Sequence, residues 1–248
     1  MFGDQPFDQA FKTVRELGYT GIEIAPFTLT PGAESVDVRE IAAERRREVK
    51  QQAGDAGLEM VGLKWLLAKT MGFYLTSPND NVRRETGEYL KALAQLCSDL
   101  GGSVLVLGSP QQRNLLPGVS YTEAEKYAAE VIRAAIPVYE DLGVTLALEP
   151  LSPAEGDFLL TASQAVELRQ LVDSPACRLH LDVKAMSSEK APIQAIILEN
   201  QEHLVHFHAN DPNLLGPGMG DVEFGSIFAA LKQIDYQGWV SVEVFKYE

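Results

Sequence analysis

Four side chains that could bind a metal or move a proton each stand near the end of a short apolar stretch. They are Glu149 in LALEP, Asp182 in HLDV, His208 in HFHAND and Glu243 in SVEVF. Three carboxylates held close together could not all stay ionised without a cation, because like charges raise one another's pKa. Three carboxylates and one imidazole suit a divalent metal, for which we expect Mn²⁺, with Mg²⁺, Co²⁺ or Zn²⁺ as alternatives.

The alternation of side chains along these stretches predicts which of them point into the interior. In a strand, every second side chain lies on the same face, so the aliphatic residues would face helices and the ionisable ones would face inward. On this basis Val205 and Phe207 are expected on the helix side of their strand. The side chains expected inside are Glu23, Glu149, His180, Asp182, His206, His208, Ser241 and Glu243.

The elements that must position these side chains form a repeating series of helix, tight turn and apolar strand. The seven predicted strands lie within 16–25, 55–65, 99–109, 141–150, 174–183, 201–210 and 235–245. Amphipathic helical stretches separate them, and Thr122 with Glu125 and Thr161 with Gln164 have the spacing of helix-start capping boxes. Strands that alternate with helices form a parallel sheet.

The loop lengths favour a closed sheet. Helix-to-strand turns are short, whereas strand-to-helix connections such as HANDPNLLGPGMGDVEF are long and polar. This is typical of a (β/α)8 TIM barrel, whose working loops follow the carboxyl ends of the strands. The chain provides one strand fewer than eight, so the predicted fold is an α/β TIM barrel that lacks the first strand and the last helix. Without a linker, residues 1–248 are expected to form a single domain.

Composition excludes several classes of protein. The 248 residues carry a net charge of −14, which opposes nucleic acid or an anionic membrane as a partner. Cys97 and Cys177 are too few for a disulfide scaffold or a cysteine zinc site. No stretch approaches the roughly 18 apolar residues of a membrane span, and no signal-peptide pattern is present, so a cytoplasmic location is expected. A homo-oligomer, dimer or tetramer, stays open.

At the four strand-end residues the sequence resembles the sugar isomerase/epimerase family of xylose isomerase-like TIM barrels, which includes ketose 3-epimerases, hydroxypyruvate isomerases and inosose-processing enzymes. The resemblance implies that Glu149, Asp182, His208 and Glu243 hold the metal. PGMGDVEF is similar to a family motif, and Glu155 stands where relatives have a second Glu near the substrate.

Two positions depart from the family pattern. Family members usually have a His three residues after the metal-binding Asp, and here that position is Ala185. They often have an Arg six residues after the metal-binding His, and here that position is Leu214. In the family, both of these side chains hold oxygen atoms of the substrate. Other side chains must therefore contact the substrate. The candidates are Glu155, Lys184, Arg113, Lys64 and His206.

These residues predict a reaction on a small sugar or polyol ketone. Glu149 and Glu243 would form an acid/base pair that removes a proton beside the carbonyl and returns one through an enediolate. Return to the same carbon would give epimerisation, and return to its neighbour would give isomerisation. Two alternatives stay open: a metal-dependent lyase or dehydratase acting on an inosose-like substrate, and a catalytically impaired barrel with a binding or assembly role.

Overall fold

Among the described residues, seven parallel strands form one curved sheet at the centre of the protein. The computed structural model describes residues 5–246. The strands follow one another in chain order across the sheet, and each pairs in parallel with the next. They are β1 (Gly21–Ile24), β2 (Glu59–Leu63), β3 (Val104–Leu107), β4 (Thr145–Leu148), β5 (Cys177–Asp182), β6 (Leu204–Ala209) and β7 (Val240–Val242). This nearly closed barrel of seven strands confirms the predicted fold.

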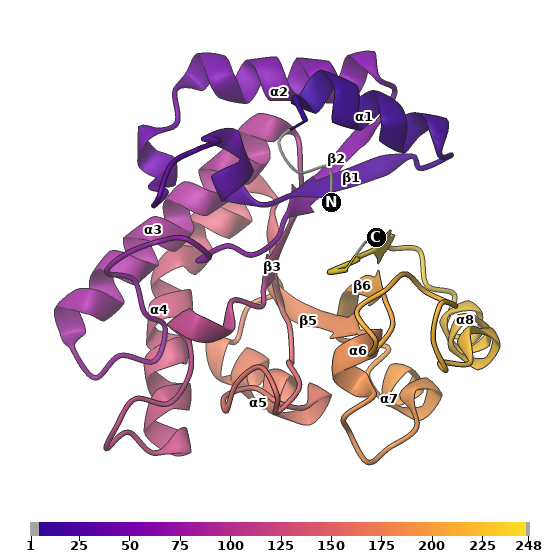
Figure 1. The fold of residues 1–248 in the computed structure, drawn as a ribbon. Coiled ribbons are helices and arrows are strands. Elements are labelled where there is room, and N and C mark those ends of the chain that lie inside the picture. The colour runs from indigo at the N-terminus through magenta and orange to yellow at the C-terminus, as the bar shows by residue number, and fades with distance from the viewer. Residues whose placement is uncertain (1–4, 247–248) are drawn as a thin grey trace.

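Helices surround the sheet on its outer side (Figure 1). The α-helices are α1 (Phe7–Glu16), α2 (Ala43–Asp55), α3 (Asp80–Leu100), α4 (Tyr121–Leu142), α5 (Ala162–Val172), α6 (Val183–Met186), α7 (Ile193–Glu199) and α8 (Phe224–Gln233). Three short 3-10 helices, η1 (Pro26–Leu29), η2 (Val38–Glu40) and η3 (Pro110–Gln112), lie in the loops that follow strands or lead into helices. Among residues 5–246 no helix is both long enough and apolar enough to cross a membrane.

Local capping explains where the helices begin. Half of the predicted box at Thr161 is confirmed, because its hydroxyl accepts from the Gln164 N–H at the start of α5. The Gln164 side chain accepts from the Leu160 N–H instead of the Thr161 N–H. The predicted box at Thr122 is wrong. Ser120 and Glu123 form the reciprocal box instead, and Thr122 already lies inside α4. Both pairs have the same spacing, and the chain uses the one that stands before the first helical residue.

The strand cores divide into an outer and an inner layer, as the alternation predicts, with one exception. Leu146, Leu148 and Phe207 belong to the large cluster between sheet and helices. Val205 packs with the smaller inner cluster of Val104, Val106 and Ala147, so its predicted place on the helix side is wrong. The register of β6 against β5 shifts at this point, and the irregularity turns Val205 inward beside His206.

Side chains, rather than backbone pairing, join the two edge strands. Figure 1 shows β1 and the C-terminal strand facing each other across the seam of the barrel. The Trp239 indole lies over Gly21, where an added Cβ would be 2.8 Å from the ring. Deeper in the interior, the Ser241 hydroxyl donates to the Glu23 carboxylate. The seam is thus closed by an indole and a buried hydrogen bond.

Candidate active site

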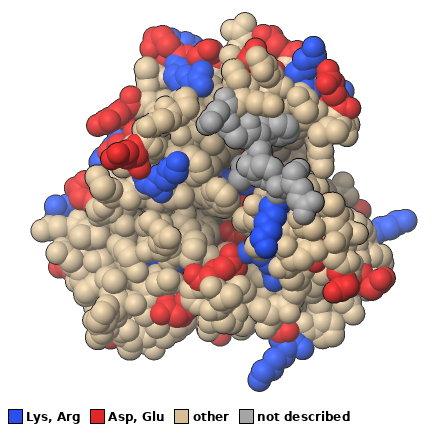
Figure 2. Space-filling view, viewed as in Figure 1, with Lys and Arg blue, Asp and Glu red and all other residues tan. Residues whose placement is uncertain are grey.

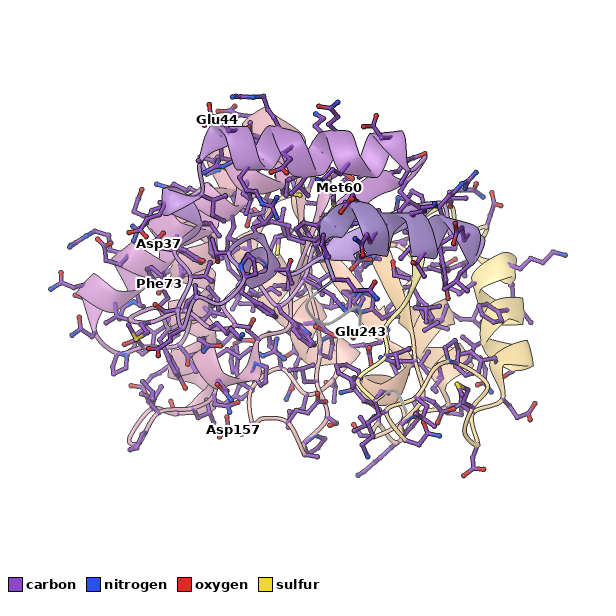
Figure 3. The ribbon with its side chains drawn as sticks, turned by 45° about the horizontal axis from the view of Figure 1, so that its top comes forward. Asp37, Glu44, Met60, Phe73, Asp157 and Glu243 are labelled. Atoms are coloured by element: carbon purple, nitrogen blue, oxygen red, sulfur yellow. The ribbon has the colours of Figure 1, made fainter. Side chains whose placement is uncertain are left out.

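The four predicted metal ligands meet at the mouth of the barrel. Glu149 and Glu243 directly follow β4 and β7, Asp182 ends β5, and His208 lies in β6. All four side chains are buried, and Figure 3 shows Glu243 in the middle of the molecule. His208 Nδ1 lies 3.3 Å from Glu243 Oε2 and 4.0 Å from Asp182 Oδ2. The carboxyl ends of four neighbouring strands thus bring these groups to one place.

Asp182 is held by a network that includes a residue missed from the sequence. Its Oδ1 accepts from the Ala185 N–H at 2.8 Å, which caps α6, and its Oδ2 accepts from Asn210 Nδ2 at 2.6 Å. The Asn210 side-chain Oδ1 in turn accepts from the Lys184 N–H. Asn210 shares the inward parity of His206 and His208, and that alternation could have identified it.

Gly108, which follows β3, leaves the space that Glu149 occupies. A Cβ at this position would lie 1.7 Å from Glu149 Oε2, far inside contact distance. Glu149 can therefore reach the mouth only because residue 108 has no side chain. No sequence pattern pointed to this glycine.

We expect Gly108→Ala to displace the Glu149 carboxylate and to lower stability by about 1–3 kcal/mol, as overpacking does. Mn²⁺ titration calorimetry and thermal unfolding measure the two effects. Gly54→Ala in α2 is the matched control, because a Cβ there meets nothing within 4 Å. Equal Mn²⁺ affinity in the Gly108→Ala variant and the control would contradict this role for Gly108.

Lys64 and Glu243 form a buried ion pair. Lys64 follows β2, and its Nζ lies 2.8 Å from Glu243 Oε1, with 8% and 3% of the two side chains exposed. The same amine lies 5.2 Å from the centre of the Trp65 ring. Lys64, predicted as a substrate contact, thus directly contacts one of the two predicted acid/base groups.

Arg113 and His206, two other predicted substrate contacts, bond to groups of the protein. Both side chains are fully buried. The Arg113 guanidinium donates to the carbonyl oxygens of Leu107 and Leu159, and burial lowers its pKa to about 10. His206 Nε2 lies 2.6 Å from Glu23 Oε1. These contacts brace the loop after β3 and the floor of the site.

A hollow with a volume of about 40 Å³ opens beside Glu149 and Glu243. Glu149, Leu151, Glu155, Lys184 and Glu243 line it together with Trp65, Gly108, Pro110 and Phe245. Lys184 Nζ donates to Glu155 Oε1 and lies 4.6 Å from the centre of the Phe245 ring. Figure 2 shows acidic and basic side chains meeting at a depression in the middle of this face. Of the predicted substrate contacts, Glu155 and Lys184 therefore face the hollow.

The crowded carboxylates have very different pKa values. Burial and the charges of Glu243 and Asp182 raise the pKa of Glu149 to about 8, and burial and Glu243 raise that of Asp182 to about 6. Burial would also raise the pKa of Glu243, but His208 and Lys64 bring it down to about 2. Without a metal, the two groups are thus shifted in opposite directions, Glu149 towards the protonated form and Glu243 towards the ionised form.

This difference predicts how the metal-free protein responds to pH. Glu149 has a higher pKa folded than unfolded, so its contribution to stability is present below about pH 4.5 and is lost as the pH rises through 8. We expect the Tm of metal-free protein to fall between pH 5 and 8, and to fall less in Glu149→Gln. Added Mn²⁺ should remove the loss. An identical pH profile for the two metal-free proteins would contradict the assignment.

The donors suit a divalent cation. His208 Nδ1 has no hydrogen-bond partner in the described chain, although it faces Glu243 and Asp182. Ligand atoms of Glu149, His180, Asp182 and His208 all lie within 4.8 Å of one another. A buried imidazole nitrogen without a partner, surrounded by carboxylates that suppress one another's ionisation, is what a bound cation relieves. Of the four predicted ligands, Glu149, Asp182 and His208 therefore fit such an ion together with His180. Glu243 lies outside this group in the described residues and pairs with Lys64.

His180, expected to face inward, lies close to this group. Its Nε2 is 3.7 Å from Glu149 Oε1. Both of its ring nitrogens lack a hydrogen-bond partner in residues 5–246. Burial, together with neighbouring His208 and His206, holds its pKa well below the usual value, so the ring is neutral. A neutral imidazole can support or supplement the predicted donors.

The two positions that depart from the family pattern have structural contacts. The Ala185 N–H bonds to Asp182, and its methyl group is buried. Leu214 has a φ of 75°, and its carbonyl oxygen accepts from the N–H groups of Phe245 and Lys246. Leu214 thereby anchors the segment that follows Glu243. Neither side chain can bond to a substrate oxygen, so polar contacts must come from elsewhere in the hollow.

Comparison with known proteins identifies the family. A family model described as a xylose isomerase-like TIM barrel matches residues 11–248. The chain belongs to this family of TIM barrels. A D-psicose 3-epimerase from Clostridium cellulolyticum, solved with D-tagatose, has the same fold with a TM-score of 0.86, at 22% identity over 98% of this chain and 80% of that one.

Curated relatives narrow the class of enzyme. A probable ketose 3-epimerase from Synechocystis sp. is 29% identical over 97% of this chain and 79% of its own length. A 2-oxo-tetronate isomerase from Pectobacterium atrosepticum is 26% identical over 98% of this chain and 88% of its own length. The chain is accordingly an isomerase or epimerase enzyme.

Proposed function

We propose that the chain is a divalent-metal-dependent epimerase or isomerase of a ketose or related polyol ketone. Glu149, Asp182, His208 and Glu243 would hold the metal, with Mn²⁺ as the expected ion. Glu149 and Glu243 would exchange protons with the substrate. The observation that carries the proposal is the pair of carboxylates, Glu149 and Glu243, which line one hollow from different strands.

The two glutamates suit opposite halves of a proton transfer. Glu243, whose buried partner Lys64 favours the ionised form, can accept a proton from the carbon beside the carbonyl. Glu149, the second carboxylate that lines the hollow, can deliver a proton to the substrate once it has taken one up. Because the two carboxylates approach the hollow from β7 and β4, one can act on each face of a planar enediolate. Delivery to the same carbon inverts its configuration.

A bound divalent ion would polarise the substrate carbonyl and make the adjacent C–H more acidic. The chain's own contribution is to orient the donors. Asn210 and the Ala185 N–H fix the Asp182 carboxylate, and Lys64 fixes that of Glu243. Burial excludes bulk water from these groups and strengthens their electrostatic interactions.

The upper part of the hollow would bind the rest of the substrate. The Trp65 and Phe245 rings stack with centroids 6.2 Å apart and form an apolar wall against which C–H faces of a sugar can pack. The Lys184–Glu155 pair offers a donor and an acceptor for hydroxyl groups. These contacts would replace the ones that Ala185 and Leu214 cannot make.

The test is a panel of ketoses, aldoses and inososes incubated with the Mn²⁺-loaded protein and followed by NMR. The proposal predicts conversion of at least one ketose into a product of equal mass. A product that has lost water would instead identify a dehydratase, since the same residues could expel a β-hydroxyl after proton removal. No conversion by protein shown to contain Mn²⁺ would favour a binding role and contradict the proposal.

A further inference from the structure

Glu23 contacts two histidines and the seam of the barrel at once. It lies in β1, at the edge of the sheet, and 6% of its side chain is exposed. Its Oε1 lies 2.6 Å from His206 Nε2, and its Oε2 lies 3.0 Å from His208 Nε2. The Ser241 hydroxyl donates to the same Oε1. One carboxylate therefore holds groups from β6 and β7.

These contacts determine which ring nitrogen of His208 is free to bind a metal at the mouth of the barrel. A carboxylate only accepts hydrogen bonds, so Nε2 of His208 must carry the hydrogen that it donates to Glu23. In the neutral ring, Nδ1 then has the free lone pair. That nitrogen is the one that faces Glu243 and Asp182 and has no hydrogen-bond partner in the described chain.

We propose that Glu23 is a positioning residue for the metal site, which holds the His208 ring by Nε2 so that Nδ1 is presented to the ion. The inference depends on the proposed function, because it assigns a partner to one of the proposed ligands. His206 fixes the Glu23 carboxylate from a further direction, whereas Ser241 ties its Oε1 to β7 across the seam. Glu23 makes no contact with the hollow and acts only through His208.

The same geometry distinguishes two roles of Glu23: it positions the His208 ring, and it joins the two edge strands at the seam. The Ser241 hydroxyl bonds to Glu23 Oε1 and so joins Glu23 to β7, whereas the His208 ring bonds to the other oxygen, Oε2. Loss of the Ser241 hydroxyl would therefore weaken the seam alone. Loss of the second carboxylate oxygen would release His208, because an amide offers only one accepting oxygen.

The experiment compares the Mn²⁺ dissociation constant and the Tm of wild type, Glu23→Gln and Ser241→Ala. Glu59→Gln, an exposed glutamate at the start of β2, controls for the lost charge. We expect Glu23→Gln to weaken Mn²⁺ binding by about 10- to 100-fold, the usual cost of losing the hydrogen-bond partner of a metal ligand. Ser241→Ala should lower the Tm and leave the Mn²⁺ affinity at the wild-type value.

Three results would overturn parts of the account in different ways. Wild-type Mn²⁺ affinity in Glu23→Gln, with a lower Tm, would show that Glu23 serves the seam only and would overturn the inference. No Mn²⁺ binding by wild type would contradict the proposed function and the inference together. If Glu23→Gln does not fold, Glu23→Asp takes its place: its shorter carboxylate cannot span both histidines, and unchanged affinity there would equally overturn the inference.

Discussion

Replacing Glu149 with glutamine is expected to reduce turnover of the substrate by about 10²- to 10⁴-fold, the usual contribution of a positioned acid or base. Glutamine keeps the size of the side chain and one carbonyl oxygen toward the mouth but can neither hold nor deliver a proton. The rate should be measured at saturating Mn²⁺ with the bound metal quantified. If the rate falls while the metal content stays the same, the loss can be attributed to the missing proton transfer.

Glu243→Gln should cause a loss of similar size, because the reaction needs one carboxylate on each side. Glu199→Gln, an exposed glutamate at the end of α7, is the matched control and should keep the wild-type rate. If either site variant retained wild-type turnover, the acid/base assignment would be wrong even if the metal site were correct. An unequal loss would identify the group whose proton transfer limits the rate.

Lys64→Met is expected to be the most destabilising substitution at the site. It removes the cation from a buried pair and leaves Glu243 beside two other carboxylates, which costs about 3–5 kcal/mol in buried pairs of this kind. For a chain of this length each kcal/mol lowers the Tm by about 2–4 °C. Thermal unfolding of the metal-free protein measures the effect.

A double-variant cycle distinguishes the lost ion pair from lost packing. If the isolated Glu243 charge causes the destabilisation, Lys64→Met combined with Glu243→Leu should be more stable than Lys64→Met alone. Added Mn²⁺ should also restore part of the Tm in Lys64→Met, since it supplies a positive charge beside Glu243. Additive losses in the cycle, with no effect of Mn²⁺, would show that Lys64 contributes only through its packing.

The barrel and the four convergent residues were predictable because they depend on local rules. Alternation along a strand assigns each side chain to a face, and parallel strands bring their carboxyl ends to one rim. Glu149, Asp182, His208 and Glu243 therefore come together without any knowledge of the long-range packing. The same alternation placed Glu23 in the interior, although it did not reveal the contact with His208.

Features that depend on contacts across the barrel could not be predicted in this way. The irregularity in β6 that turns Val205 inward comes from the register against β5, which no single-strand pattern specifies. The need for glycine at residue 108 follows from the path of the Glu149 side chain on the next strand. Lys64 and Glu243 are brought together only when the sheet curves, since β2 and β7 are far apart in its strand order.

The account is tested most directly by the position of deuterium in the product that the Mn²⁺-loaded enzyme forms from a ketose in D₂O. Proton removal by one glutamate and return by the other predicts one solvent deuterium on the carbon that accepts the proton, and a loss of this incorporation when the metal is chelated. A product formed at full rate without deuterium at that carbon would contradict the account. The hydrogen would then have moved directly between carbons, and Glu149 and Glu243 would not be the acid/base pair.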